Sequence, residues 1–206
     1  MPLIITKLPM KIWYLKFYLG KFKRFDLLNL DKFELKDGEI LLLFSDKFDS
    51  YSYDDLDISD KIKLKNSPNL AKNSEFKISR SLKIYFKKYY KNRKNIPLYT
   101  SLSHSNNCAI LAISTRRVGV DLEFIKKRNF NAHMDFCFSD EQRFRVANSQ
   151  NQLIEFYKIW TLKEARIKLL NLGFYALDRV SDESLGAFGE IMQCSNKSFI
   201  YSVAIY

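Results

Sequence analysis

The chain alternates short apolar runs of strand length with amphipathic stretches of helix length, and this alternation limits its fold more than any other feature. Runs 39–45 and 108–114 are almost wholly apolar and have the length of buried strands. Segments 11–19, 118–124 and 199–206 are further predicted strands. Since strands and helices are mixed and no internal repeat is visible, the sequence predicts an α+β fold.

Helical periodicity is clearest in a segment that begins near Ser74 and ends before the turn at 92–97. Its apolar side chains recur on one face, and a basic stripe runs beside them. The apolar face consists of Ile78, Leu82, Tyr85, Phe86 and Tyr89, and the stripe of Arg80, Lys83, Lys87 and Lys91.

Two further helices and a hairpin are predicted downstream. Ser139 and Gln142 have the spacing of a capping box at a helix start. A long helix is predicted over 152–172, ended by Gly173. Because only a short basic link separates runs 108–114 and 118–124, we expect these two strands to form a hairpin.

Composition places the chain among globular proteins. With 206 residues and 47% hydrophobic side chains, it suits one large domain or two small packed lobes. No stretch approaches the roughly 20 apolar residues of a membrane span. The three cysteines lack metal or redox spacing, which fits a reducing compartment. We therefore expect a cytoplasmic protein that does not bind a membrane.

The net charge of +11 is unevenly distributed. Segment 26–60 carries 3 basic and 11 acidic residues, whereas segment 61–94 carries 12 basic residues and one acid, Glu75. Such a basic block attracts polyanions: nucleic acid, acidic protein surfaces, membranes or phosphate-rich ligands. A lysine-rich genome would produce the same bias, so charge alone does not assign a function.

Two carboxylates share one side of the predicted strand 118–124. Because side chains alternate along a strand, Asp121 and Glu123 project from one face and Val120 and Leu122 from the other. A hard divalent cation with oxygen ligands would relieve their repulsion. A solvated strand face with two ordinary acids explains the same pattern.

Two other segments carry polar groups with ligand-binding chemistry. Glu164 and Lys168 are four residues apart on the long helix, and alone this spacing is that of a surface salt bridge. Together with the two strand carboxylates, the pair could complete a metal and phosphate site. Ser103 and His104 precede a buried strand and suit phosphate oxygens. A serine hydrolase is disfavoured, because the Gly-x-Ser-x-Gly elbow is absent and the chain has only two histidines.

Together these motifs resemble a known family. His104-Ser105 is followed by Gly119-Val-Asp-x-Glu123 and then by Trp160-x-x-Lys-Glu-Ala-x-x-Lys168, with supporting matches at 76–80 and 136–141. The ordered set is similar to the 4′-phosphopantetheinyl transferase superfamily, in particular the surfactin-synthetase-activating (Sfp) type. The resemblance covers about residues 73–173.

The resemblance implies two similar lobes related by a pseudo-twofold axis, with coenzyme A and Mg²⁺ between them. Residues 1–115 would form the N-terminal lobe, on the nucleotide side of coenzyme A, and residues 116–206 the C-terminal lobe, with the metal strand and the catalytic helix. The enzyme would transfer the 4′-phosphopantetheine arm of coenzyme A to a serine of an acyl or peptidyl carrier protein.

The resemblance also implies a role for each motif residue. Mg²⁺ would be bound by Asp121, Glu123 and Glu164. Glu164 would help to deprotonate the attacking serine, and Lys168 would contact the coenzyme and stabilise or protonate the leaving group. The coenzyme would further be bound by Arg80, Ser103 and His104.

The sequence departs from the family pattern at two basic positions. Asn95-Ile96-Pro97 stands where the family often has Gly-Lys-Pro, so that lysine is missing or is replaced by Lys94, and Asn73 stands in place of an arginine. The implied partner is an acidic carrier protein, and the implied state is a monomer that does not bind nucleic acid. The alternative is a basic, non-enzymatic nucleic-acid-binding module built on 61–94, although no established nucleic-acid-binding motif supports it.

Overall fold

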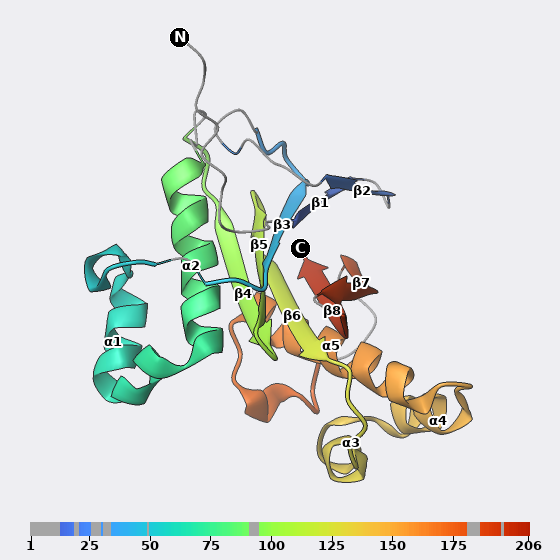
Figure 1. Cartoon of the computed structure of the whole chain (residues 1–206). Helices are drawn as coiled ribbons and strands as arrows, with labels where there is room; N and C mark the ends of the chain where they lie inside the picture. Colours follow the sequence, from blue (N-terminus) through green and yellow to red (C-terminus); the bar gives the residue numbers. More distant parts are fainter. Residues whose placement is uncertain are drawn as a thin grey trace.

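The computed structural model describes residues 13–18, 21–25, 30, 34–48, 50–90, 95–180, 186–194 and 196–206, and its fold is α+β. Figure 1 shows two sheets with helices packed on their outer faces. A five-stranded antiparallel sheet has the order β2-β1-β3-β5-β4, and a three-stranded antiparallel sheet has the order β6-β8-β7. The strands are β1 (Trp13–Tyr18), β2 (Lys21–Phe25), β3 (Ile40–Ser45), β4 (Tyr99–Ser105), β5 (Cys108–Ser114), β6 (Val118–Phe124), β7 (Gly186–Cys194) and β8 (Lys197–Ile205).

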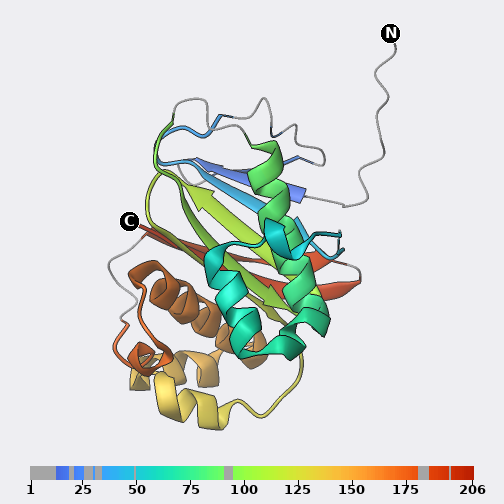
Figure 2. The same ribbon diagram turned by 90° about the vertical axis from the view of Figure 1, so that its left-hand side faces the viewer.

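Figure 2 shows α1 and α2 lying side by side over one face of the five-stranded sheet. The long helix α5 packs against β6 and β8 of the other sheet, and α4 packs against α5. The helices are α1 (Ile58–Asn66), α2 (Ser74–Tyr89), α3 (Asn131–Cys137), α4 (Asp140–Asn148) and α5 (Gln152–Leu170), with short 3₁₀ turns at Tyr53–Asp55, Pro68–Lys72 and Phe174–Ala176.

The apolar runs predicted as buried strands, β3 and β5, are covered on both faces. Alternate residues of β5 point to opposite sides, so Leu111 joins a core beneath α2 while Ile110 joins a core between the two sheets. The same alternation separates Leu41 from Leu42 on β3. A strand covered on both faces needs an unbroken apolar run, which both sequences have.

The metal strand predicted from the sequence, β6, has the predicted alternation. Val118, Val120 and Leu122 belong to the core between the sheets, together with residues of β3, β5 and β8. Asp121 and Glu123 therefore project from the opposite face, the side on which α5 packs.

The predicted hairpin of 108–114 with 118–124 is wrong. β5 pairs with β3 on one side and β4 on the other, so neither edge is free for β6, which pairs with β8. The hairpin partner of β5 is β4, a strand that the sequence analysis did not assign. Asn106 and Asn107 form the turn between them with positive φ angles of 47° and 61°, which asparagine tolerates better than most residues.

Helix boundaries were predicted more reliably than strand partners. α2 begins at Ser74, and the capping box of Ser139 with Gln142 is present at the start of α4. The predicted end of the long helix at Gly173 is wrong, because α5 ends at Leu170 and Asn171 caps it in the left-handed conformation with φ 54°. Lys91 and Lys94 lie outside the described residues.

None of the helices in the described part of the chain combines the length and the apolar composition that crossing a bilayer requires. Two of the cysteines, Cys108 and Cys137, are buried and free, and they contribute to the apolar cores.

Candidate functional site

The polar groups singled out in the sequence gather where the edge strands β4 and β6 meet. Ser101 Oγ accepts a hydrogen bond of 3.0 Å from the Val120 amide, and Ser105 Oγ accepts one of 3.1 Å from the Phe124 amide. Because 101, 103 and 105 alternate along β4, all three serines face β6. Serine hydroxyls therefore join the two sheets along a polar seam.

Three carboxylates converge at this seam. Asp121 and Glu123 come from β6 and Glu164 from α5, and their nearest ligand oxygens all lie within 4.8 Å of one another. Asp121 is buried, while Glu123 and Glu164 are half-buried. The fold thus brings together all three residues for which metal binding was predicted.

The acid cluster is electrostatically strained. Burial and the neighbouring Asp121 charge raise the pKa of Glu164, and the same two causes raise the pKa of Glu123. Among the described residues, Asp121 Oδ2 is a buried oxygen without a hydrogen-bond partner. A buried carboxylate oxygen normally has a partner. An all-oxygen donor set with an unpaired buried oxygen fits a hard divalent cation.

Lys168 lies at one side of the acid cluster. Its Nζ donates to Asp121 Oδ1 at 2.8 Å, to Ser103 Oγ at 3.0 Å and to the Val120 carbonyl at 3.1 Å. The ammonium therefore forms its ion pair with a residue on β6, rather than acting only as the neighbour of Glu164 on α5. Since Ser103 also donates to Asp121 Oδ1 at 2.8 Å, the lysine and the serine hold the same oxygen and leave Oδ2 to another ligand.

Gly119 explains how α5 reaches the metal strand so closely. A Cβ atom at this position would lie 1.9 Å from the Ala165 carbonyl oxygen and 2.6 Å from the Leu169 amide. Only glycine permits this approach of helix backbone to strand. The contact places Glu164 and Lys168, which immediately precede the contact residues Ala165 and Leu169, close to the carboxylates of β6.

His104 faces the other side of β4 from Ser103. Its Nδ1 lies 3.3 Å from Glu75 Oε2, on the first turn of α2. Burial lowers the pKa of His104, the Glu75 charge opposes this effect, and Arg80 and Lys168 add to it. The imidazole therefore lies within electrostatic range of α2 on one side and of Lys168 on the other.

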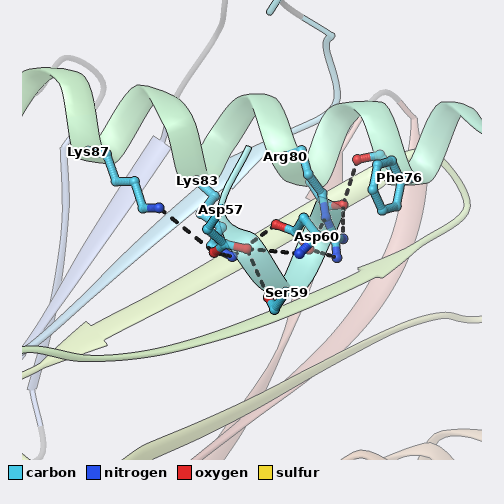
Figure 3. Close-up of polar contacts among 8 residues, drawn as sticks. Asp57, Ser59, Asp60, Phe76, Arg80, Lys83 and Lys87 are labelled. Atoms are coloured by element: carbon cyan, nitrogen blue, oxygen red, sulfur yellow. Dashed lines mark hydrogen bonds and ion pairs between the residues drawn. The ribbon is translucent and has the colours of Figure 1, made fainter. Parts of the chain in front are cut away.

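Arg80 is held by α1, as Figure 3 shows. Its Nε and Nη2 donate to Asp60 Oδ1 at 3.0 and 2.7 Å, and its Nη1 donates to Ser79 Oγ at 2.9 Å. The guanidinium carbon also lies 4.2 Å from the centre of the Phe76 ring. Within the described part of the chain, each guanidinium nitrogen thus makes one hydrogen bond.

The rest of the basic stripe on α2 is paired with the same helix (Figure 3). Lys83 forms ion pairs with both Asp57 and Asp60, and Lys87 lies 3.8 Å from Asp57. The three described residues of the stripe are therefore paired with acids from the preceding segment.

Four residues of this arrangement were not identified from the sequence. Ser101 extends the serine pattern to three alternating positions, a signal that was readable. Gly119 was read only as part of a motif, although its need for close backbone approach depends on α5. Glu75 and Asp60 gain their roles from contacts between helices and strands that no spacing shows.

Comparison with known proteins adds independent support for the second half of the chain. Residues 117–195 match the family model of the 4′-phosphopantetheinyl transferase superfamily. The matched segment contains Asp121, Glu123, Glu164 and Lys168, but not Arg80 or His104.

Relatives with the same description match comparable shares of the chain. The 4′-phosphopantetheinyl transferase gsp of Aneurinibacillus migulanus is 32% identical over 95 residues, which cover 45% of this chain and 40% of the relative. A putative 4′-phosphopantetheinyl transferase of Haemophilus influenzae is 33% identical over 85 residues, covering 39% and 36%. The 4′-phosphopantetheinyl transferase AcpT of Salmonella typhi is 31% identical over 102 residues, covering 48% and 53%.

The matches with these three relatives thus span from 36% to 53% of the relatives' own length. Similarity to the superfamily is shown for the part of the chain that carries the metal strand and α5.

Proposed function

We propose that this chain is an Sfp-type 4′-phosphopantetheinyl transferase, which moves the phosphopantetheine arm of coenzyme A to a serine of a carrier protein. The observation that carries the proposal is the cluster of three carboxylates beside Lys168. It lies within the segment similar to the superfamily. The cluster provides oxygen ligands for a cation and, next to them, a fixed ammonium for a phosphate.

In the proposed reaction the carrier serine oxygen bonds to the phosphorus that bears the pantetheine arm. The bond from that phosphorus to the bridging pyrophosphate oxygen breaks, and 3′,5′-adenosine bisphosphate leaves. Mg²⁺, held by Asp121, Glu123 and Glu164, would supply electrostatic stabilisation of the charge on the pyrophosphate.

The chain's own residues have two further roles in this proposal. Glu164 accepts the proton of the attacking serine. Lys168 stabilises the negative charge that develops on the leaving oxygen. Its hydrogen bonds to Asp121 and Ser103 fix the position of its ammonium group between β4 and β6.

The residues to which we assign contacts with the coenzyme lie on β4 and α2. They are Ser103 and His104 on β4 and Arg80 on α2. The lowering of the His104 pKa by the Arg80 and Lys168 charges supports this assignment, because it indicates that both cations lie near the imidazole. Two similar lobes, residues 1–115 and 116–206, belong to the same proposal, as do a cytoplasmic monomer and an acidic carrier protein.

The structure gives the alternative function, nucleic-acid binding through segment 61–94, little support. The similarity of residues 117–195 to the superfamily does not favour it. Of the twelve basic residues in 61–94, Arg80, Lys83 and Lys87 are engaged by Asp57 and Asp60.

The test is incubation of the chain with coenzyme A, Mg²⁺ and candidate carrier proteins, followed by intact mass measurement of the carrier. We expect the carrier to gain the mass of one phosphopantetheine arm, and we expect EDTA to prevent the gain. Absence of labelling with every carrier, together with a salt-sensitive shift of DNA or RNA in a gel, would favour the alternative.

A further inference from the structure

The contact of His104 with Glu75 is unused by the proposed chemistry, yet it connects the first turn of α2 to the site strand β4. His104 Nδ1 and Glu75 Oε2 are 3.3 Å apart, and both side chains are about one-third exposed, 37% and 32%. Glu75 also accepts a hydrogen bond of 3.4 Å from the Asn107 amide at the tip of the β4–β5 hairpin. The carboxylate is therefore held at two points beside the imidazole.

We propose that Glu75 is a positioning residue that keeps Nδ1 of His104 protonated, so that Nε2 is the nitrogen that meets a phosphate group of the ligand. This inference rests on the proposed function, in which His104 contacts the coenzyme. A carboxylate beside one ring nitrogen fixes the tautomer, because it accepts only from an N–H. The other nitrogen then points away from α2.

Phosphate binding at Nε2 requires a second proton on the ring. A neutral imidazole whose Nδ1–H faces Glu75 presents a lone pair at Nε2, which would repel a phosphate oxygen. When the ligand binds, the ring takes up one proton from solvent at Nε2, and that N–H donates to the phosphate. Glu75 stabilises the resulting imidazolium from the opposite side.

The charged neighbours of His104 determine the direction of this effect. Glu75 on α2 raises the pKa of the imidazole, whereas Arg80 on α2 and Lys168 on α5 lower it, in addition to burial. Of these groups, Glu75 alone favours the protonated ring. Without it, His104 would have to gain its proton against two cations.

The first experiment follows the His104 proton directly. The chain has only two histidines, His104 and His133, so two imidazole resonances can be titrated by NMR and assigned with a His133→Asn variant. We expect Glu75→Gln to lower the pKa of His104. We expect saturating 3′,5′-adenosine bisphosphate to raise it in the wild type. Glu75→Asp, which keeps the charge but is one methylene shorter, should lie between the two.

The second experiment measures transfer as a function of pH. Loss of an exposed ion pair corresponds to a roughly two- to fivefold change in affinity. We therefore expect Glu75→Gln to raise KM for coenzyme A about two- to fivefold at pH 8 and to leave kcat unchanged. The difference should narrow as the pH falls, because a growing fraction of the ring is then protonated in both proteins.

Ser74→Ala is the matched control, since Ser74 donates to Asn107 at the same hairpin tip but carries no charge. It should change neither the His104 titration nor KM. An unchanged His104 pKa in Glu75→Gln, or a fall in kcat at constant KM, overturns the assignment. If the wild type binds neither coenzyme A nor adenosine bisphosphate, the proposed function fails with it. If the wild type binds coenzyme A but Glu75→Gln has the same KM for it as the wild type, only the role of Glu75 is overturned and the proposed function stands.

Discussion

Asp121 makes hydrogen bonds with two neighbouring side chains of the site, Lys168 and Ser103. These bonds decide which of its oxygens is available to a cation. One of its oxygens accepts from Lys168 and Ser103, and the other is buried without a partner. Glu164 approaches from α5 and raises the local negative charge. A site of this kind suits a cation. We expect substitutions of its residues to differ in effect: some should abolish cation binding, and others should reduce turnover.

Removal of the unpaired oxygen should abolish cation binding. We expect Asp121→Asn to lose transfer at any practical Mg²⁺ concentration, because an amide replaces the one carboxylate that is fully buried in the cluster. In the wild type, Mg²⁺ should raise the Tm by binding only the folded state. That rise should be absent from Asp121→Asn, and normal transfer by the variant at limiting Mg²⁺ would contradict the assignment.

Glu164 and Lys168 should affect turnover far more than stability. We expect Lys168→Ala to reduce kcat by roughly 10²–10³, the usual loss of one preorganised electrostatic group. Glu164→Gln should reduce kcat to a similar extent. Without Mg²⁺ it should keep or raise the Tm, because it relieves repulsion within the cluster. Glu164→Asp should restore only part of the activity.

Glu155→Gln is the matched control for these variants, since Glu155 lies on the same helix and pairs with Arg145 away from the cluster. Its kcat should equal that of the wild type. Near-normal turnover in both Lys168→Ala and Glu164→Gln would leave these residues with structural roles only.

At the scale of elements, two helix contacts depend on single residues. α5 lies against β6 because Gly119 has no side chain, and α1 is held to α2 through Asp60, the one residue of α1 that is buried. The first contact is steric and the second electrostatic. They should therefore respond to different perturbations.

Gly119→Ala should displace α5. The added Cβ would overlap backbone atoms of Ala165 and Leu169, so the helix must move rather than a side chain. Overpacking of this kind costs about 1–3 kcal/mol or more of unfolding free energy. We expect a lower Tm and a loss of turnover. In the control Gly173→Ala, the new Cβ would meet only the exposed Tyr175 ring, which can rotate, so little change is expected.

Asp60→Asn should loosen α1 and leave the Arg80 charge buried without its partner. Breaking a buried ion pair on one side costs roughly 3–5 kcal/mol. The matched variant Asp57→Asn keeps the amide-accepting cap and should cost only about 1 kcal/mol, since its pair with Lys83 is partly exposed. Urea unfolding of both variants measures the difference. For the same reason, Arg80→Ala would destabilise the fold as well as any coenzyme contact.

The Asp57 contribution should depend on pH. Burial raises its pKa, but the bond to Lys83 and those to Asp60 and Ser59 outweigh this effect and lower it well below the usual range. A lowered pKa stabilises the folded state above the unfolded pKa of about 4, and this stabilisation is lost as the pH falls further. The stability gap between wild type and Asp57→Asn should therefore shrink between pH 5 and pH 3. A constant gap would contradict the pairing.

At the scale of the whole molecule, strands that precede residue 115 form one sheet and strands that follow residue 117 form the other. The boundary near Thr115 thus coincides with a change of sheet. The two sheets nevertheless share one apolar core, built from β3 and β5 on one side and β6 and β8 on the other. The proposed lobes would therefore be structural halves rather than independent folding units.

Separate expression of residues 1–115 and 116–206 tests this view. Each fragment would expose the apolar face that the other covers, so we expect both to lack cooperative thermal unfolding when alone. Mixing them should restore a cooperative transition and Mg²⁺-dependent transfer. Cooperative unfolding of fragment 116–206 by itself would show that the lobe folds independently.

Local physics made the elements predictable from the sequence. The apolar face of α2, the capping box of α4 and the alternation along β6 all depend on residues within one element, so their spacing sufficed. The convergence of Asp121, Glu123 and Glu164 was expected only through family resemblance, because no spacing relates a strand to a helix forty residues later.

Tertiary structure alone decided which strands pair and which charges meet. β6 lies in the sheet of β8 rather than beside β5 because both edges of β5 are already occupied. The acidic segment that contains Asp60 neutralises the basic stripe on α2 because a turn returns one segment onto the other. Such contacts depend on long-range packing, which is cooperative over the whole chain, and they determine that Lys168 pairs with Asp121 and that His104 faces Glu75.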